Sequence, residues 1–349
     1  MTQLTSVLSH ELDLAGLARM GLLLAVIWWM YGGYAWLTNA VPPRKTSTRG
    51  LLVLAMVAYV VLAISVPSAF EANRWAFAAA YLVIVLVHSG VFLTTAHPSN
   101  RQGTPRVLPW NLTVPLLTRP GTFDLRPSPK RNRHSVERHG LVLTRPGTFD
   151  LRPSPKRNRH SVERHGLVLI IAFGESVVAI GIGEAGLEVT PGLIVAAALP
   201  MVTLAGLWWG YFAGDSEKRA EATLTTAEPF RRTRLSLIGY GHCYLPLFGG
   251  IIVLAAGVKT AVAHPEDALS APAALAVGGG MALYLVGDVL LRLGSNWTRC
   301  VAAVLAAAST VVGATESAVA QLAVLAAVVV LLVAAEHLAR QPGGVPSSR

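Results

Sequence analysis

Residues 166–183 read GLVLIIAFGESVVAIGIG, an apolar stretch with one carboxylate, Glu175, near its middle. A stretch of this length comes close to crossing about 30 Å of hydrocarbon as an α-helix. A charge at the centre of such a helix costs about 2.5–3.5 kcal/mol, and each Leu, Ile, Phe or Val returns about 0.3–0.6 kcal/mol. The surrounding apolar residues therefore still allow insertion, and the cost decides where Glu175 points. We expect it to face the interior of a helix bundle and to turn away from lipid.

The whole composition agrees with a lipid environment. Of the 349 residues, 53% are hydrophobic and only 14% are charged, against about a quarter charged in soluble domains. Apolar runs near twenty residues recur along the chain, so the sequence predicts an all-α, polytopic transmembrane helical bundle of about nine spans. We place these spans at residues 17–37, 51–70, 75–96, 166–183, 191–213, 235–258, 269–291, 300–315 and 318–337.

The basic residues predict the orientation. If the first span runs inward, every one of the 29 Lys and Arg residues except Arg19, Arg74 and Lys259 falls on the cytoplasmic side. This is the asymmetry that the positive-inside rule describes. We therefore expect a bacterial inner-membrane protein with its N-terminus outside and its C-terminus in the cytoplasm. The same distribution explains the net charge of +10 without a nucleic-acid partner, and the lipid bilayer is the partner we expect.

The chain divides into three parts and a tail. Residues 1–96 hold the first three spans, 97–165 form a basic irregular cytoplasmic loop, 166–337 hold the remaining six spans, and 338–349 form a cytoplasmic tail. Within the loop, residues 118–143 are repeated without one change as 144–169. Architectural repeats normally occur in three or more diverged copies, so two identical tandem copies indicate a recent duplication.

A fainter similarity suggests an internal repeat. Residues 24–31 read LAVIWWMY and residues 204–211 read LAGLWWGY. Both lie in spans with the same predicted direction, which is typical of parallel repeats. Aromatic residues also gather at membrane interfaces, so the repeat and a shared interfacial composition remain alternatives.

Small residues border the acid of the fourth span. Ala172, Ser176, Ala179 and Gly183 follow helical spacing and form one narrow face, and Glu175 lies beside it. Small faces let membrane helices approach closely, so we assign Ala172, Ala179 and Gly183 to helix packing. Glu175 and Ser176 then become candidates for a proton or solute path, with a hydrogen-bonded structural acid as the alternative for Glu175.

Few polar groups in other spans could partner this acid. His242 lies in the sixth span and His88 near the middle of the third, and either is a path residue or a hydrogen-bonded core histidine. Asp288 in the seventh span is one helical turn from Arg292, so we expect these two to pair near the cytoplasmic face.

The residues ahead of the fourth span form a helix-entry motif of Glu163, Arg164 and Gly166. A Glu at a helix N-terminus suits the helix dipole, so capping is the alternative to a functional role.

The sequence shows no recognisable catalytic or metal-binding motif. Cys243 and Cys300 are isolated thiols at membrane depth, which form neither a disulfide framework nor a zinc site. No hydrolase, metalloprotease or phosphate-loop motif occurs in a plausible context. We expect no enzyme activity, no cofactor and no metal.

The string SVERHGLVLIIAFGESVVAIGIG at 161–183, with YGH at 240–242 and VAHP at 262–265, resembles the bacterial low temperature requirement protein A family. The similarity runs over residues 21–98 and 117–337. It implies a polytopic membrane protein linked to growth at low temperature, and the family's molecular activity is not established.

The sequence departs from the family pattern in three places. The Glu-Leu-Phe-Phe-Asp-like opening helix is absent, and the segment after Trp110 is shorter than in the family. The lead-in to Glu163 is longer and duplicated. The resemblance therefore implies a shortened member with an internal duplication.

Two functions remain open from the sequence. The first is a transporter or channel-like protein that moves protons or a small solute through Glu175, with His242 assisting. The second is a non-transporting membrane protein that supports the envelope in the cold through lipid or protein contacts. The residues leave the oligomeric state open, with a homo-oligomer among the alternatives.

Overall fold

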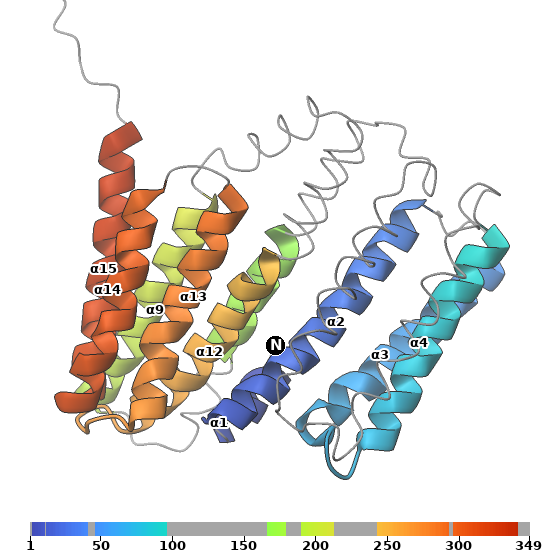
Figure 1. The fold of residues 1–349 in the computed structure, drawn as a ribbon, viewed down its shortest axis with the longest axis horizontal. Helices are drawn as coiled ribbons and strands as arrows, with labels where there is room; N and C mark the ends of the chain where they lie inside the picture. The colour runs from blue at the N-terminus through green and yellow to red at the C-terminus, as the bar shows by residue number, and fades with distance from the viewer. Residues whose placement is uncertain are drawn as a thin grey trace, which may run out of the picture. The chain divides into compact units, whose positions relative to one another are not determined.

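A computed structural model of the chain describes residues 2–10, 12–40, 46–95, 166–178, 190–212, 243–292 and 296–340. Within these ranges every regular element is a helix, and none is a strand (Figure 1). The predicted all-α membrane bundle is confirmed as the class of fold.

Eight of the described helices are long and apolar enough to cross a bilayer, and each overlaps one of the nine predicted spans. The remaining predicted span, 166–183, is described as the shorter apolar helix Gly166–Val178, and residues 179–183 lie outside the described ranges. The eight long helices are α2 (Leu14–Ala40), α3 (Thr46–Ser65), α4 (Arg74–Thr95), α9 (Pro191–Phe212), α12 (Tyr244–Ala263), α13 (Ala271–Arg292), α14 (Trp297–Thr315) and α15 (Ala318–Arg340).

The N-terminal segment contains a helix that the apolar pattern does not predict. Helix α1 (Thr2–His10) buries Leu4 and Leu8 on one face and packs against α12. Asp13 then starts α2, because its carboxylate accepts a hydrogen bond from the backbone N–H of Gly16 at 2.6 Å. A nine-residue helix whose two buried leucines are four positions apart is too short to stand out in a search for spans.

The sixth span ends later than its predicted boundary at residue 258. Helix α12 continues past Lys259 because Ala261 and Val262 are fully buried. It stops at Ala263, and the next residue, His264, has an extended φ of −136°. Pro265 follows directly, and a proline disfavours the helical conformation of the residue before it.

The helices form two compact units. One comprises Met1–Gly21, His160–Thr223 and His242–Arg349, and the other comprises Leu22–Arg159 and Leu224–Gly241, so the boundary passes through α2. The predicted division at residues 97–165 and 338–349 stays a prediction, because almost all of these residues lie outside the described ranges.

In the first unit, α12 packs on α13, α13 on α14, α14 on α15, and α15 on α9 (Figure 1). The closest approach joins α12 and α13. A Cβ on Gly250 would overlap the backbone of Tyr284, and a Cβ on Gly280 would overlap the backbone of Leu254. Only glycine permits this reciprocal contact of two helix backbones, which is how membrane helices gain packing contact without a hydrophobic driving force.

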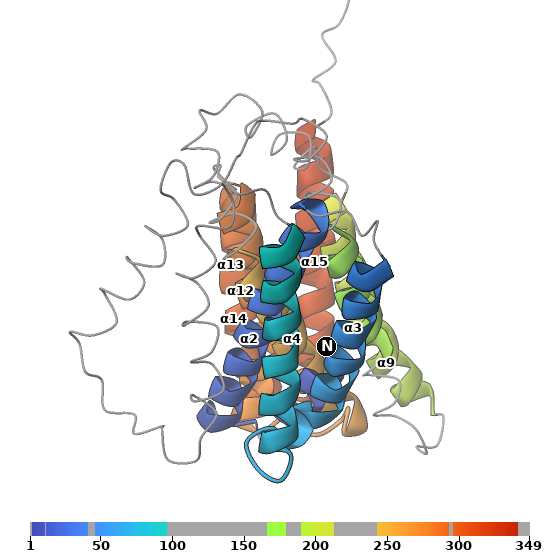
Figure 2. The same ribbon diagram turned by 90° about the vertical axis from the view of Figure 1, so that its right-hand side faces the viewer.

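In the second unit, α3 and α4 lie side by side and are joined by the short 3₁₀ helix η1 (Val66–Ser68) (Figure 2). Leu37 of α2, Ala55 of α3, and Val87 and Val91 of α4 form its buried core. Much of the remaining apolar surface of α3 is exposed, which is expected of a helix with lipid as its solvent.

Candidate functional site

The helix Gly166–Val178 places Glu175 at the border of its buried face. Leu169, Ala172, Phe173 and Ser176 are buried, and Glu175 is half-buried. The neighbouring positions 174, 177 and 178 are exposed. At 100° per residue, Glu175 therefore lies where the packed surface of the helix meets the exposed one.

One contact to another helix, and one hydrogen bond within the helix itself, are seen on its buried face. The Phe173 ring meets the Tyr284 ring of α13 edge to face, with ring centroids 5.8 Å apart. The Ser176 hydroxyl donates a hydrogen bond to the carbonyl oxygen of Ala172 at 2.9 Å, so its polar group is satisfied within the helix. Glu175 lies two residues after Phe173, about 200° away around the helix axis, so this contact does not itself place the carboxylate against α13.

A buried ion-pair cluster joins the ends of four other helices of the same unit. The Arg292 Nε donates to both carboxylate oxygens of Asp288, at 3.0 and 2.9 Å. The predicted pair of Asp288 and Arg292 is therefore confirmed. The second Arg of the cluster, Arg299 of α14, donates to the same carboxylate and forms a second ion pair with it.

Arg299 also binds a second acid. Its Nε and Nη2 atoms donate to the two carboxylate oxygens of Glu336 at 2.6 and 2.8 Å, which is the parallel geometry that suits a guanidinium. Glu336 lies near the C-terminal end of α15, so Arg299 ties α13 to α15. The two arginines, Asp288 and Glu336 together carry no net charge, as a cluster buried at the edge of a membrane requires.

The cluster also closes the end of α9. Gly210 lies in the last turn of that helix, where carbonyl groups have no partner within the helix. Its carbonyl oxygen accepts hydrogen bonds from Arg292 and Arg299, both at 2.9 Å. Two positive charges at a helix C-terminus are also favoured by the helix dipole. The cluster therefore fixes four helix ends in one arrangement.

Tyrosines extend this polar region. The hydroxyls of Tyr211 and Tyr244 are 2.6 Å apart and bond each other across α9 and α12. The Tyr284 hydroxyl donates to the carbonyl oxygen of Leu207 at 3.3 Å. Tyr284 also contacts Phe173. The helix that carries Glu175 therefore packs against the same side chain of α13 that bonds to α9.

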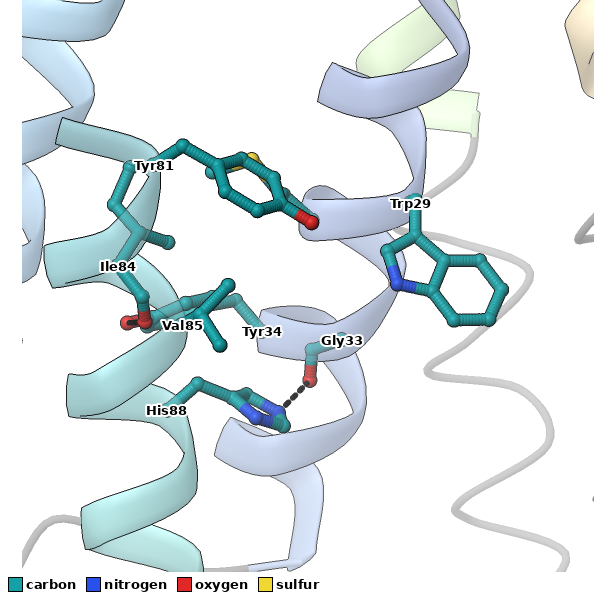
Figure 3. A pocket seen from close by; sticks show the side chains of 8 residues that line it. Trp29, Gly33, Tyr34, Tyr81, Ile84, Val85 and His88 are labelled. Atoms are coloured by element: carbon teal, nitrogen blue, oxygen red, sulfur yellow. Dashed lines mark hydrogen bonds between the residues drawn. The ribbon is translucent and has the colours of Figure 1, made fainter. Parts of the chain in front are cut away.

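His88 lies in the second unit and is hydrogen-bonded there. Its Nε2 is 3.1 Å from the carbonyl oxygen of Gly33, and its ring packs against Tyr34 (Figure 3). This geometry matches a hydrogen-bonded core histidine. His88 belongs to the second unit and Glu175 to the first.

Several predicted site residues lie outside the described ranges, namely His242, Glu163, Arg164, Ala179 and Gly183. Gly166 begins the helix Gly166–Val178 and is buried. No group of three metal-binding side chains occurs among the residues that the structure describes.

The sequence did not single out Arg299 or Glu336. Arg299 was read only as one of the cytoplasmic basic residues, and Glu336 lies in the last turns of an apolar helix. The feature that could have pointed to them is their predicted side of the membrane. Asp288, Arg299 and Glu336 all lie near helix ends that the charge pattern places on the same side, which puts opposite charges at one membrane face without saying which helices are neighbours.

Apolar helices of spanning length and an ion cluster confined to their ends define the class of protein, a polytopic helical membrane protein. Residues 1–335 match the family of bacterial low temperature requirement A proteins (LtrA), and the chain belongs to that family. It is also 28% identical over 312 residues to an uncharacterized protein of Rhizobium meliloti (strain 1021), RA0937, an alignment that covers 84% of this chain and 73% of the relative. No solved structure matches the chain.

Proposed function

We propose that this membrane protein moves protons or a small solute, and that Glu175 is the group that takes up and releases the proton. One observation carries the proposal, namely the half-buried position of Glu175 on a membrane helix packed against α13. An acid at this depth costs about 2.5–3.5 kcal/mol at insertion, so its retention needs a reason. Intramembrane acids of this kind mark ion pathways and proton relays.

The ion cluster supports the proposal by supplying a rigid frame. Arg299 and its partners fix the ends of α9, α13, α14 and α15. The helix Gly166–Val178 meets this frame where the Phe173 ring packs on the Tyr284 ring of α13. Weak contacts of this kind allow a helix to shift against a fixed neighbour, as rocking transport mechanisms require.

The orientation and partners follow from the charge pattern. The proposed location is the bacterial cell membrane, with the N-terminus outside and the C-terminus in the cytoplasm. Lipid and a proton or small solute are the proposed partners. Neither an enzymatic reaction nor nucleic-acid binding forms part of this function.

One observation favours the alternative of a non-transporting envelope protein. The backbones of α12 and α13 are locked together at Gly250 and Gly280, which suits a scaffold that does not move. In that case Glu175→Gln would retain growth in the cold. A bulky side chain at the fully buried Ala172 would abolish it by displacing the helix.

The test is proton flux into liposomes that contain the purified full chain and a pH-sensitive dye. Wild type should move protons faster than empty liposomes, and Glu175→Gln should lower the excess rate at least tenfold. The matched control is Glu316→Gln, because Glu316 is an exposed acid at the turn after α14. Flux that survives Glu175→Gln undiminished, or wild-type flux no faster than empty liposomes, contradicts the proposal.

The same variants belong in a cold-growth complementation assay. Loss of growth with Glu175→Gln and normal growth with Glu316→Gln would link the flux to the family's phenotype. Growth that is normal with both variants would favour the scaffold function.

A further inference from the structure

The second unit contains a small hollow between α2 and α4 (Figure 3). Its polar lining comprises Trp29, Gly33 and Tyr34 from α2, and Tyr81 and His88 from α4. It provides a cavity volume of about 30 Å³ for the centres of water molecules. About 10–15 Å³ on this measure holds one water, so the hollow has room for one or two.

The hydrogen bonds at the hollow leave specific acceptors on its lining. A carbonyl oxygen can only accept, so the His88 Nε2 that faces the Gly33 carbonyl carries the proton. In the neutral ring, Nδ1 is then an acceptor. The Tyr34 hydroxyl donates its proton to the Ile84 carbonyl oxygen at 2.9 Å, so the Tyr34 oxygen also keeps accepting capacity.

Tyr81 supplies the complementary donor. Its ring extends from α4 toward α2, and its hydroxyl is buried without a hydrogen-bond partner among the described residues (Figure 3). A buried hydroxyl without an acceptor loses its hydration and gains nothing in return. In lipid no bulk solvent can reach it, so an acceptor has to be bound locally.

We propose that the hollow is a water-binding site, in which one or two water molecules accept the Tyr81 proton and donate to Tyr34 and His88. Water is the ligand that fits, because the site is small, holds both donors and acceptors, and offers the two to four polar partners that a buried water needs. The site lies wholly in the second unit and does not use Glu175, so it stands apart from the proposed transport function.

Tyr59 provides a matched control. Its hydroxyl is also buried without a partner among the described residues, but Tyr59 lies in α3 and does not line the hollow. Its ring packs edge to face against Tyr34, with centroids 5.5 Å apart. Removing a dry, unsatisfied hydroxyl should stabilise the protein, and removing one that is bonded to water should destabilise it. The Tyr→Phe changes at the two positions should therefore alter the stability of the protein in opposite directions.

The experiment measures thermal unfolding of the full chain in lipid nanodiscs for Tyr81→Phe and Tyr59→Phe. We expect Tyr81→Phe to lower the midpoint by about 2 °C or more and Tyr59→Phe to leave it unchanged or raise it. Hydroxyl-radical footprinting of the wild type, with radicals generated from water by X-rays, gives the second readout. Tyr81 should be oxidised at least threefold faster than Tyr59.

A midpoint that rises with Tyr81→Phe as it does with Tyr59→Phe would show a dry hollow and overturn the proposal. Equal oxidation of the two tyrosines would overturn it as well, even if Tyr81→Phe lowers the midpoint. Both phenylalanine variants keep the ring and its packing, so neither result depends on a protein that fails to fold.

Discussion

Arg299 of α14 and Asp288 of α13 form an ion pair whose side chains are exposed by only 2% and 1%. Burying two charges costs several kcal/mol per ion unless every hydrogen-bonding group finds a partner. Here the guanidinium also reaches Glu336 and the Gly210 carbonyl, and the Asp288 carboxylate also binds Arg292. The pair is therefore the centre of a satisfied network, and each member depends on the others.

Removing Arg299 should be the most damaging change in this network. Arg299→Ala leaves Asp288 and Glu336 without their shared partner, and breaking a buried pair from one side costs about 3–5 kcal/mol. Glu336→Gln should cost clearly less, because the Glu336 side chain is 16% exposed. Thermal unfolding in nanodiscs would check the order, with the double variant showing non-additive loss. Equal losses for both single variants would contradict a network centred on Arg299.

The contrast between the spans and this cluster shows how far the sequence could be read. Spans of about twenty apolar residues are a local property, so eight of the nine predicted runs coincide with long helices. The pair of Asp288 and Arg292 was also readable, because residues four apart share a helix face. The pairs of Arg299 with Asp288 and Glu336 join different helices, and spacing along the chain says nothing about which helices are neighbours.

Two other features show the same limit of local patterns. Helix α1 was missed because nine residues with two buried leucines resemble any polar N-terminal segment. The glycines of α12 and α13 were not singled out in the sequence analysis. Their role in close packing depends on the opposing backbone, which the sequence does not show.

Neighbouring glycines of α13 should respond differently to alanine. Gly280→Ala places a methyl group against the backbone of Leu254 in α12, which cannot move aside, so the two helices must separate. Gly279→Ala meets only the side chain of Leu275 on its own helix, at 3.5 Å, and gains up to about 1 kcal/mol of helix propensity. Thermal unfolding in nanodiscs should show a loss of stability for Gly280→Ala and no loss of stability for Gly279→Ala. Two equal effects would mean that α12 and α13 are not in backbone contact.

Deleting residues 118–143 should leave the membrane topology unchanged. The deletion removes one of two identical copies and retains residues 144–169, which lead into the helix Gly166–Val178. No predicted span is lost, and charges in a long loop contribute little to orientation. The labelling of single cysteines with a membrane-impermeant reagent, introduced at Glu266 and Ser295, should give the same sidedness with and without the deletion. A reversal at either position would show that the duplicated loop sets the topology.

Gly313 and Gln321 should show a compensating pair of effects. The Gln321 side chain of α15 donates to the Ala274 carbonyl oxygen at 2.8 Å and to the Ser309 hydroxyl at 3.3 Å. Its amide therefore links α13, α14 and α15, and a Cβ on Gly313 would overlap that amide.

Gly313→Ala should destabilise the protein by about 1–3 kcal/mol, because the overlap pushes a hydrogen-bonded side chain out of place. Gln321→Ala alone should cost about 1–2 kcal/mol from its lost hydrogen bonds. In the double variant the methyl group introduced by Gly313→Ala enters space that the amide has left, so the loss should be smaller than the sum of the two single losses. A double-mutant cycle on thermal unfolding in nanodiscs measures this coupling. Strict additivity would mean that the two side chains do not share the same space between α14 and α15.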